Sequence, residues 1–302
     1  MTTSTVEPLG DYVLTLACLD QPGIVHAVTS FLLENGGNIR ESQQFGDRES
    51  GRFFMRIDFE TAQASDAGML HAAFATTAAQ FEMSYDLWSA QAPYRTLIMC
   101  SKQLHCLNDL LFRTTTGDLQ IEVPLVISNH RDAEPLARSH GIDFLHLPVT
   151  PDTKAEAEAE LLRKVDELGI DLVVLARYMQ VLSDPTCRAL EGRAINIHHS
   201  FLPSFKGARP YQQAFEHGVK LVGATAHYVT GDLDEGPIIE QDTVRITHAQ
   251  SPDDYVSLGR DVEASVLSRA VHAHIHHRSF LNGNKTVVFP ASPNSYASER
   301  MG

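Results

Sequence analysis

Residues 194–241 read AINIHHSFLPSFKGARPYQQAFEHGVKLVGATAHYVTGDLDEGPIIEQ, and they indicate the fold of the second half of the chain. The first five residues alternate between apolar and polar, which predicts a β-strand with Asn196 and His198 on one face. A second apolar run, 221–229, predicts another strand, and a turn-rich loop that carries Asp234 follows it. Because α/β sheets bind ligands in loops beyond the carboxyl ends of their strands, we expect these three side chains to meet there.

The three side chains suit chemistry at a carbonyl group. The amide of Asn196 and a cationic imidazole at His198 would donate hydrogen bonds that stabilise an oxyanion. A carboxylate at Asp234 would orient that imidazole and favour its charged form. The set contains no obvious nucleophile, so it predicts acyl transfer in which water or an amine attacks without a covalent enzyme intermediate. Taken singly, each residue also fits an ordinary structural role in a strand or a turn.

Four motifs in this half of the chain follow one another in a fixed order. They are NIHHSFLP at 196–203, KG at 206–207, GATAHYV at 223–229 and LDEGPII at 233–239. This order resembles the folate-dependent formyltransferase family, whose signature is Asn-x-His-x-Ser-x-Leu-Pro followed by a Leu-Asp-x-Gly-Pro loop. The resemblance implies that Asn196, His198 and Asp234 form a catalytic triad around the formyl group of 10-formyltetrahydrofolate. It also implies that the folate is the substrate and that no metal or other cofactor takes part.

The resemblance also assigns folate contacts to two loops. Residues 178–182 follow a predicted strand and resemble the family's pterin-pocket loop, in which backbone groups contact the pterin and apolar side chains cover it. The residues carried over are Met179, Gln180, Val181, Leu182, Thr230, Gly231, Asp232 and Leu233. Without the resemblance, 178–182 would be interpreted as an ordinary apolar strand end.

The composition is that of a globular enzyme, with 302 residues of which 43% are hydrophobic and 21% charged. A formal net charge of −14 argues against a nucleic-acid-binding surface. The four cysteines show no C-x-x-C spacing, so neither a disulfide framework nor a zinc site is indicated, and we expect a reducing cytoplasm. The amino terminus lacks a signal-peptide pattern, and no apolar run approaches the ~20 residues of a membrane span.

The first part of the chain predicts a small domain of its own. Its expected elements are a strand at 12–19, a helix at 24–34, strands at 38–45 and 52–59, a helix at 67–80 and a strand at 81–88. This βαββαβ order is the ferredoxin-like arrangement.

The first strand-to-helix turn, Asp20-x-Pro22-Gly23-Ile24, makes this domain resemble an ACT domain, a regulatory module that commonly binds amino acids. The resemblance implies a possible amino-acid effector site at Asp20, Gly23 and Ile24. For Gly23 we favour a structural role, because glycine lets the backbone turn tightly. Edge strands of such modules often pair between subunits, so we expect a homo-oligomer.

We place a linker at 89–93, between an ACT-like domain at 1–88 and a catalytic domain at 94–302. Strands and helices alternate beyond the linker, which predicts a doubly wound, mostly parallel, Rossmann-like sheet with helices on both faces. A long helix begins after Ser251 and ends in His272, His274, His276 and His277. Their i to i+2 spacing points the rings to different sides of a helix, which disfavours metal binding and leaves their role open. A terminal hairpin is predicted over 281–289.

The turn after the first strand of the catalytic domain bears on the acceptor of the formyl group. Family members that formylate a glycinamide ribonucleotide carry a Gly-rich phosphate loop there, at a helix amino terminus. Residues 101–106 read SKQLHC and contain no glycine, although Lys102 could hold a phosphate as a point charge. The sequence therefore favours hydrolysis of 10-formyltetrahydrofolate to tetrahydrofolate and formate. Two alternatives are transfer to an amine such as glycinamide ribonucleotide and an amino-acid sensor with a degenerate folate site.

Overall fold

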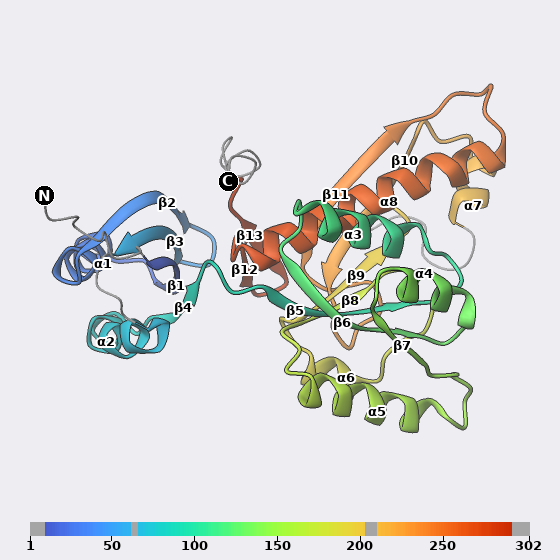
Figure 1. Ribbon diagram of the computed structural model, residues 1–302. Helices are drawn as coiled ribbons and strands as arrows, with labels where there is room; N and C mark the ends of the chain where they lie inside the picture. The colour runs from blue at the N-terminus through green and yellow to red at the C-terminus, as the bar shows by residue number, and fades with distance from the viewer. Residues whose placement is uncertain (1–9, 62–65, 203–209, 292–302) are drawn as a thin grey trace, which may run out of the picture. The chain divides into compact units, whose positions relative to one another are not determined.

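A computed structural model describes residues 10–61, 66–202 and 210–291, which fall into two compact units (Figure 1). The first unit comprises the chain up to Ala92 together with His276–Asn282 and Val287–Pro290. The second comprises the described residues of Pro93–Ile275, together with Gly283–Thr286 and Ala291. The sequence prediction put every residue from 94 onwards into the second domain, whereas the structure groups residues 276–282 and 287–290 with the first unit.

The first unit is a four-stranded antiparallel sheet with two helices. Its elements are β1 (Gly10–Leu19), α1 (Ile24–Glu34), β2 (Gly37–Asp47), β3 (Arg52–Thr61), α2 (Ala67–Gln80) and β4 (Ser84–Ser89). The strand order is β2-β3-β1-β4, with antiparallel neighbours throughout. The predicted ferredoxin-like βαββαβ order is confirmed.

The two faces of β3 explain why the end of the chain belongs to this unit. One set of alternate residues joins the core beneath the helices, whereas Phe54 and Arg56 point to the opposite face and are also buried. The ring of Phe280 lies 5.9 Å from the ring of Phe54, centroid to centroid. Arg56 and Arg278 both pair with the carboxylate of Glu41. The C-terminal segment thus covers a sheet face that would otherwise be exposed.

The second unit is a seven-stranded sheet between two layers of helices. Its strands are β5 (Tyr94–Cys100), β6 (Ile121–Ser128), β7 (Asp143–His146), β8 (Leu172–Leu175), β9 (Ala194–His198), β10 (Leu221–Tyr228) and β11 (Ile238–Arg245). Its helices are α3 (His105–Thr116), the 3-10 turn η1 (Arg131–Ala133), α4 (Glu134–Ser139), α5 (Lys154–Glu167), α6 (Asp184–Ala189), α7 (Pro210–Glu216) and α8 (Pro252–Ile275). The predicted terminal hairpin is present as β12 (Ser279–Asn282) and β13 (Lys285–Val288).

The sheet order β11-β10-β9-β8-β5-β6-β7 is doubly wound. The five strands from β9 to β7 are parallel, and β10 and β11 are antiparallel to their neighbours. One apolar core joins the sheet to α3, α4 and α8 and another joins it to α5 and α6, and Figure 1 shows α3 and α8 on the opposite side of the sheet from α5 and α6. The predicted doubly wound, mostly parallel fold is confirmed. Because β5 lies between β6 and β8, the carboxyl ends of β5 and β8 form the switch point where such sheets bind ligands.

The histidines near the end of α8 have structural partners. Nδ1 of His274 lies 2.9 Å from the hydroxyl of Tyr228. In the first unit, the ring of His277 stacks on Trp88 with centroids 4.3 Å apart. Within 10–61, 66–202 and 210–291, no group with metal-ligand geometry includes any histidine of 272–277.

The buried imidazole of His274 predicts loss of stability in acid. Burial lowers the pKa of His274 to about 4, whereas an unfolded histidine titrates near ~6.5. The unfolded state therefore binds more protons below pH ~6.5, and stability falls towards pH 4 by up to about 1.4 kcal/mol per pH unit from this group. His274→Gln removes this titration, so its unfolding free energy, measured in urea, should fall less steeply over the same window. The exposed His248, changed to Gln, is the control, and an unchanged slope in His274→Gln would contradict the prediction.

Candidate active site

Antiparallel pairing of β9 with β10 brings four polar side chains together. The register sets Asn196 opposite His227 and His198 opposite Thr225. Nδ2 of Asn196 lies 3.2 Å from Nε2 of His227. Nδ1 of His198 lies 3.2 Å from Oδ2 of Asp234, which comes from the loop after β10. The three side chains expected to converge from the sequence therefore do meet.

The loop after β10 aims Asp234 at the strand ends. Asp234 has a φ of 56°, in the left-handed region that Asp adopts more readily than most residues. A Cβ on Gly236 would lie 1.8 Å from the carbonyl oxygen of Tyr228, so glycine is required for this close approach. The backbone N–H of Tyr228 donates to the carbonyl of Pro237 at 2.9 Å, which holds the loop against β10.

The surroundings of Asp234 keep its carboxylate ionised. Burial raises the pKa of Asp234, but the hydrogen bond and the positive charge of His198 lower it by more, so the net pKa lies well below the ordinary value. Oδ1 also lies 3.7 Å from Nε2 of His227. A carboxylate that stays charged fixes the orientation of the His198 ring through its Nδ1.

His227 belongs to this group although the sequence prediction gave it no role. Its Nδ1 lies 2.9 Å from the carbonyl oxygen of Tyr228 and must carry the hydrogen, because a carbonyl only accepts. Nε2 of the neutral ring can then accept a hydrogen bond from the Asn196 amide, which leaves the second amide hydrogen for a ligand. The sequence signal for the position of His227 is the alternation in 221–229, which puts residues 225 and 227 on one face of the strand.

A cavity of about 770 Å³ opens beside these side chains, a size that suits a small organic molecule. His198 lines the cavity, and its Nε2 is buried without a hydrogen-bond partner among the described residues. The eight residues predicted to contact folate all line the same cavity: Met179, Gln180, Val181, Leu182, Thr230, Gly231, Asp232 and Leu233. Met179, Val181 and Leu233 are more than half exposed, so they offer apolar surface to a ligand.

The loop after β8 is held in place by Ser101, at the end of β5. The Ser101 hydroxyl accepts a hydrogen bond from the backbone N–H of Met179 at 3.0 Å and donates one to Oδ1 of Asn129 at 2.7 Å. The backbone N–H of Ser101 donates to the carbonyl of Arg177 at 3.2 Å. Two of these bonds tie the loop that carries Arg177 and Met179 to the residue after β5, and the third ties Ser101 to Asn129, which follows β6.

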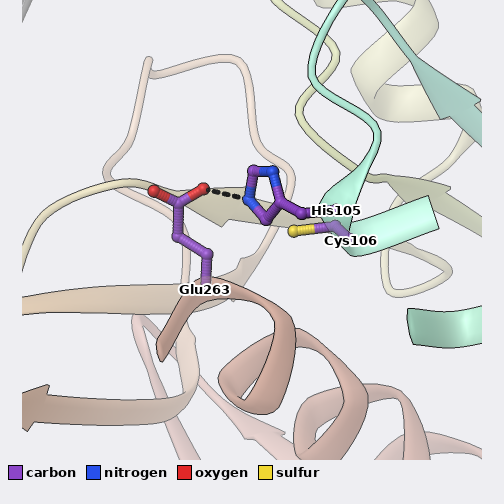
Figure 2. Close-up of side chains that lie close together, drawn as sticks. All are labelled: His105, Cys106 and Glu263. Carbon is purple, nitrogen blue, oxygen red and sulfur yellow. Dashed lines mark hydrogen bonds and ion pairs between the residues drawn. The ribbon is translucent and has the colours of Figure 1, made fainter. Parts of the chain in front are cut away.

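A second acidic group, Glu263 of α8, lies in the same cavity and is fully buried. Its Oε2 is 2.8 Å from Nε2 of His105 and 3.2 Å from Nε of Arg177. Its Oε1 accepts a hydrogen bond of 2.5 Å from the hydroxyl of Tyr211. Figure 2 shows His105 reaching from the start of α3 to Glu263, with Cys106 beside it. The sequence does hold a signal for Glu263, because it falls among the core-facing positions of α8.

The ligand atoms of His105, Cys106 and Glu263 lie within 4.8 Å of one another, close enough to share a metal ion. Both oxygens of Glu263 already accept hydrogen bonds, and the guanidinium of Arg177 supplies the positive charge. Burial and the charge of Glu263 raise the pKa of Cys106 well above its ordinary value, so the side chain is a thiol, whereas metals bind the thiolate. The chemistry of these side chains therefore fits a buried ion pair better than a metal centre.

Some predicted residues lie elsewhere. Pro203, Lys206 and Gly207, which carry part of the family resemblance, fall outside the described residues. In the first unit, Asp20 and Gly23 are exposed, and Gly23 has a φ of 98° directly before α1, as its structural role requires. The side chain of Ile24 is 2% exposed and packs in the core, so only its backbone could contact an effector.

Comparison with known proteins identifies the family. A formyl transferase family model matches residues 94–271, and an ACT domain model matches residues 12–69. A formyltetrahydrofolate deformylase from Corynebacterium sp. (strain P-1) is 53% identical over 92% of this chain and 97% of its own length. The chain belongs to the formyltetrahydrofolate deformylase family. The crystal structure of the deformylase from Burkholderia mallei is similar with a TM-score of 0.89 and 48% identity, covering 93% of this chain and all of that one.

A glycinamide ribonucleotide transformylase from Symbiobacterium toebii is similar to only part of the chain. It matches with a TM-score of 0.61 and 32% identity, over 66% of this chain and 95% of its own. The deformylases match almost the whole chain. The predicted combination of an ACT domain with a formyltransferase domain is confirmed, and it sets the deformylase family apart from this transformylase.

The close approach at Gly236 predicts a sharp response to one added methyl group. Gly236→Ala forces the new Cβ against the carbonyl of Tyr228, so we expect a loss of about 1–3 kcal/mol in the free energy of unfolding in urea. Gly68→Ala in α2 is the matched control, because its Cβ meets its nearest neighbour at an ordinary 3.7 Å. The helical control should gain up to about 1 kcal/mol. Equal effects of the two changes would show that the loop after β10 has room to move.

Proposed function

We propose that this protein hydrolyses 10-formyltetrahydrofolate to tetrahydrofolate and formate. The imidazole of His198 carries the proposal, because Asp234 holds its Nδ1 while its buried Nε2 has no partner among the described residues and adjoins the cavity. A buried polar group without a partner destabilises a protein unless a ligand satisfies it. A formyl oxygen is such a ligand. The deformylases similar to this chain are named for formyltetrahydrofolate.

The side chains suit stabilisation of an oxyanion on the formyl group. Protonated Nε2 of His198 and the free amide hydrogen of Asn196 donate to the formyl oxygen as negative charge develops on it. His227 orients the amide by taking its other hydrogen. Asp234 remains ionised and balances the charge of the imidazolium.

The reaction needs only water as a second reactant. The water oxygen bonds to the formyl carbon, and the bond from that carbon to N10 of the folate breaks. One proton from water goes to N10, which gives tetrahydrofolate, and formic acid leaves and loses the other to solvent as formate. His198 is placed to pass a proton between these atoms, with Asp234 holding its ring. We propose that no metal or cofactor takes part, because each step uses groups that the chain supplies.

Two loops are proposed to hold the pterin. The apolar side chains of Met179, Val181 and Leu233 cover the ring, and backbone groups of 179–182 and 230–233 contact its polar edge. Such a site explains why large apolar side chains stand exposed at a cavity.

The first unit is proposed to be regulatory. An amino acid bound beside Asp20 and Gly23 would be its effector, and the edge strands β2 and β4 would pair between subunits in a homo-oligomer. All four cysteines are buried and free, which suits the reducing cytoplasm.

In the part of the chain that the structure describes, no helix has the length and apolarity to cross a membrane.

Formate release from 10-formyltetrahydrofolate, with no acceptor present, tests the hydrolysis. We expect steady turnover by the purified protein and a loss of at least about 100-fold in kcat for His198→Ala and for Asp234→Asn, since each removes a group that stabilises or relays charge. Glu235→Gln is the matched control, because it neutralises an exposed carboxylate in the same loop outside the cavity lining.

The alternative function gives a different result. Formation of tetrahydrofolate and a formylated amine only when an amine is added, with no release of formate, would replace hydrolysis by transfer. Turnover of Asp234→Asn close to that of the unmodified protein would remove Asp234 from the mechanism.

A further inference from the structure

The cavity has two chemically different ends. One is the apolar end formed by the loops 179–182 and 230–233. The other is polar and is formed by His105, Arg177, His199, Tyr211 and Glu263. The proposed mechanism uses none of these five side chains.

The polar end adjoins the reacting group. The ring of His199 lies 5.2 Å from the ring of His198 and 6.3 Å from the ring of Tyr211, centroid to centroid, and so stands between the two groups. Burial and the charge of Arg177 lower the pKa of His199 to about 4, which keeps this ring neutral. With the pterin in the apolar end as proposed, the polar end is the part of the cavity left for the attacking group.

Two features of Arg177 are energetically unfavourable, its backbone conformation and the burial of its charge. Its φ of 63° lies in the left-handed region, which is strained for a residue with a Cβ. Its side chain is 12% exposed, and Nη1 is buried without a hydrogen bond to any described residue. Burying a charge is unfavourable unless a partner compensates, and Glu263 at 3.2 Å supplies that charge. A strained, buried arginine beside a reacting centre points to function.

We propose that Arg177, paired with Glu263, selects water over amines as the attacking group. This inference rests on the proposed hydrolysis. The guanidinium lines the cavity beside Glu263, where it would take up space that the substituent of a primary amine needs and that a water molecule does not. It also neutralises Glu263, the buried carboxylate that would otherwise attract an ammonium group, and its own positive charge repels one.

Neighbouring residues support this placement of the guanidinium. Ser101 fixes the backbone carbonyl of Arg177. His105 and Tyr211 bind the oxygens of Glu263 and keep the carboxylate in place. A Cβ on Gly259 would lie 2.1 Å from the ring of Tyr211, so a glycine in α8 makes room for this tyrosine.

Competition between water and glycinamide, a small primary amine, tests the proposal. The protein is incubated with 10-formyltetrahydrofolate and increasing glycinamide, and formate and N-formylglycinamide are both measured. We expect the unmodified protein to give formate at every amine concentration. Arg177→Gly, which suits the positive φ, and Arg177→Asn, which tolerates it, should raise the ratio of formylated amine to formate by at least about tenfold.

Three further variants separate selection from structural effects. Arg177→Lys keeps the positive charge and should retain most of the preference for water. Arg260→Ala removes an exposed arginine of the same cavity and should leave the product ratio unchanged. Adding Glu263→Gln to Arg177→Gly removes the carboxylate that attracts the amine and should lower the ratio again.

The two proposals fail in different ways. No formate from the unmodified protein would defeat the hydrolysis itself. Formate from a folded Arg177→Gly or Arg177→Asn protein at the same product ratio as the unmodified protein overturns the role of Arg177. A rise in the ratio for Arg260→Ala as large as that for Arg177→Gly would also overturn it, because any loss of side-chain volume would then be sufficient.

Discussion

The ion pair between His198 and Asp234 is the contact on which the site depends. It occupies Nδ1 of the imidazole and so leaves Nε2 as the atom that can meet a ligand. It forms because Asp234 adopts a left-handed turn and Gly236 lets that turn lie against β10. The same strand carries His227, which orients the amide of Asn196. The pairing of β9 with β10 therefore positions both donors through backbone geometry, before any ligand binds.

One cavity contains two buried or partly buried carboxylates, and they have different partners. Asp234 meets two imidazoles, whereas Glu263 meets an imidazole, a phenol and a guanidinium. A buried carboxylate without compensation would cost several kcal/mol, so both sets of partners are needed for folding as well as for chemistry. Burial raises the pKa values of Asp234 and Glu263, but hydrogen bonds and positive charge lower them by more. The net pKa of each carboxyl group is therefore below its ordinary value.

Local patterns in the sequence predict much of the fold and part of the site. Alternation in 194–198 and 221–229 gives the two strands, and the turn residues around Asp234 give the loop, so their meeting follows from the rule for strand ends in α/β sheets. The register between two strands is a tertiary property, and His227 becomes informative only when it is set opposite Asn196.

The partners of Glu263 could not be predicted in the same way. They come from α3, the loop after β8 and α7, and no local spacing connects these segments. Likewise, the hairpin that covers Phe54 and Arg56 looks like an ordinary chain end in the sequence. Its role depends on a sheet face formed by residues far earlier in the chain. The hydrogen bond from Arg56 to the carbonyl of His276, 220 residues later, is an example.

The choice between water and an amine cannot come from the sheet alone. A transformylase named for glycinamide ribonucleotide shares this fold over 66% of the chain, and the deformylases share it almost throughout. Donors that stabilise an oxyanion act on the carbonyl and are indifferent to which group attacks it. Selection must therefore lie in the space from which the attacking group comes. In this protein the cavity lining includes Arg177, which lies in the loop after β8 at the switch point of the sheet and outside the strands that hold Asn196, His198 and His227.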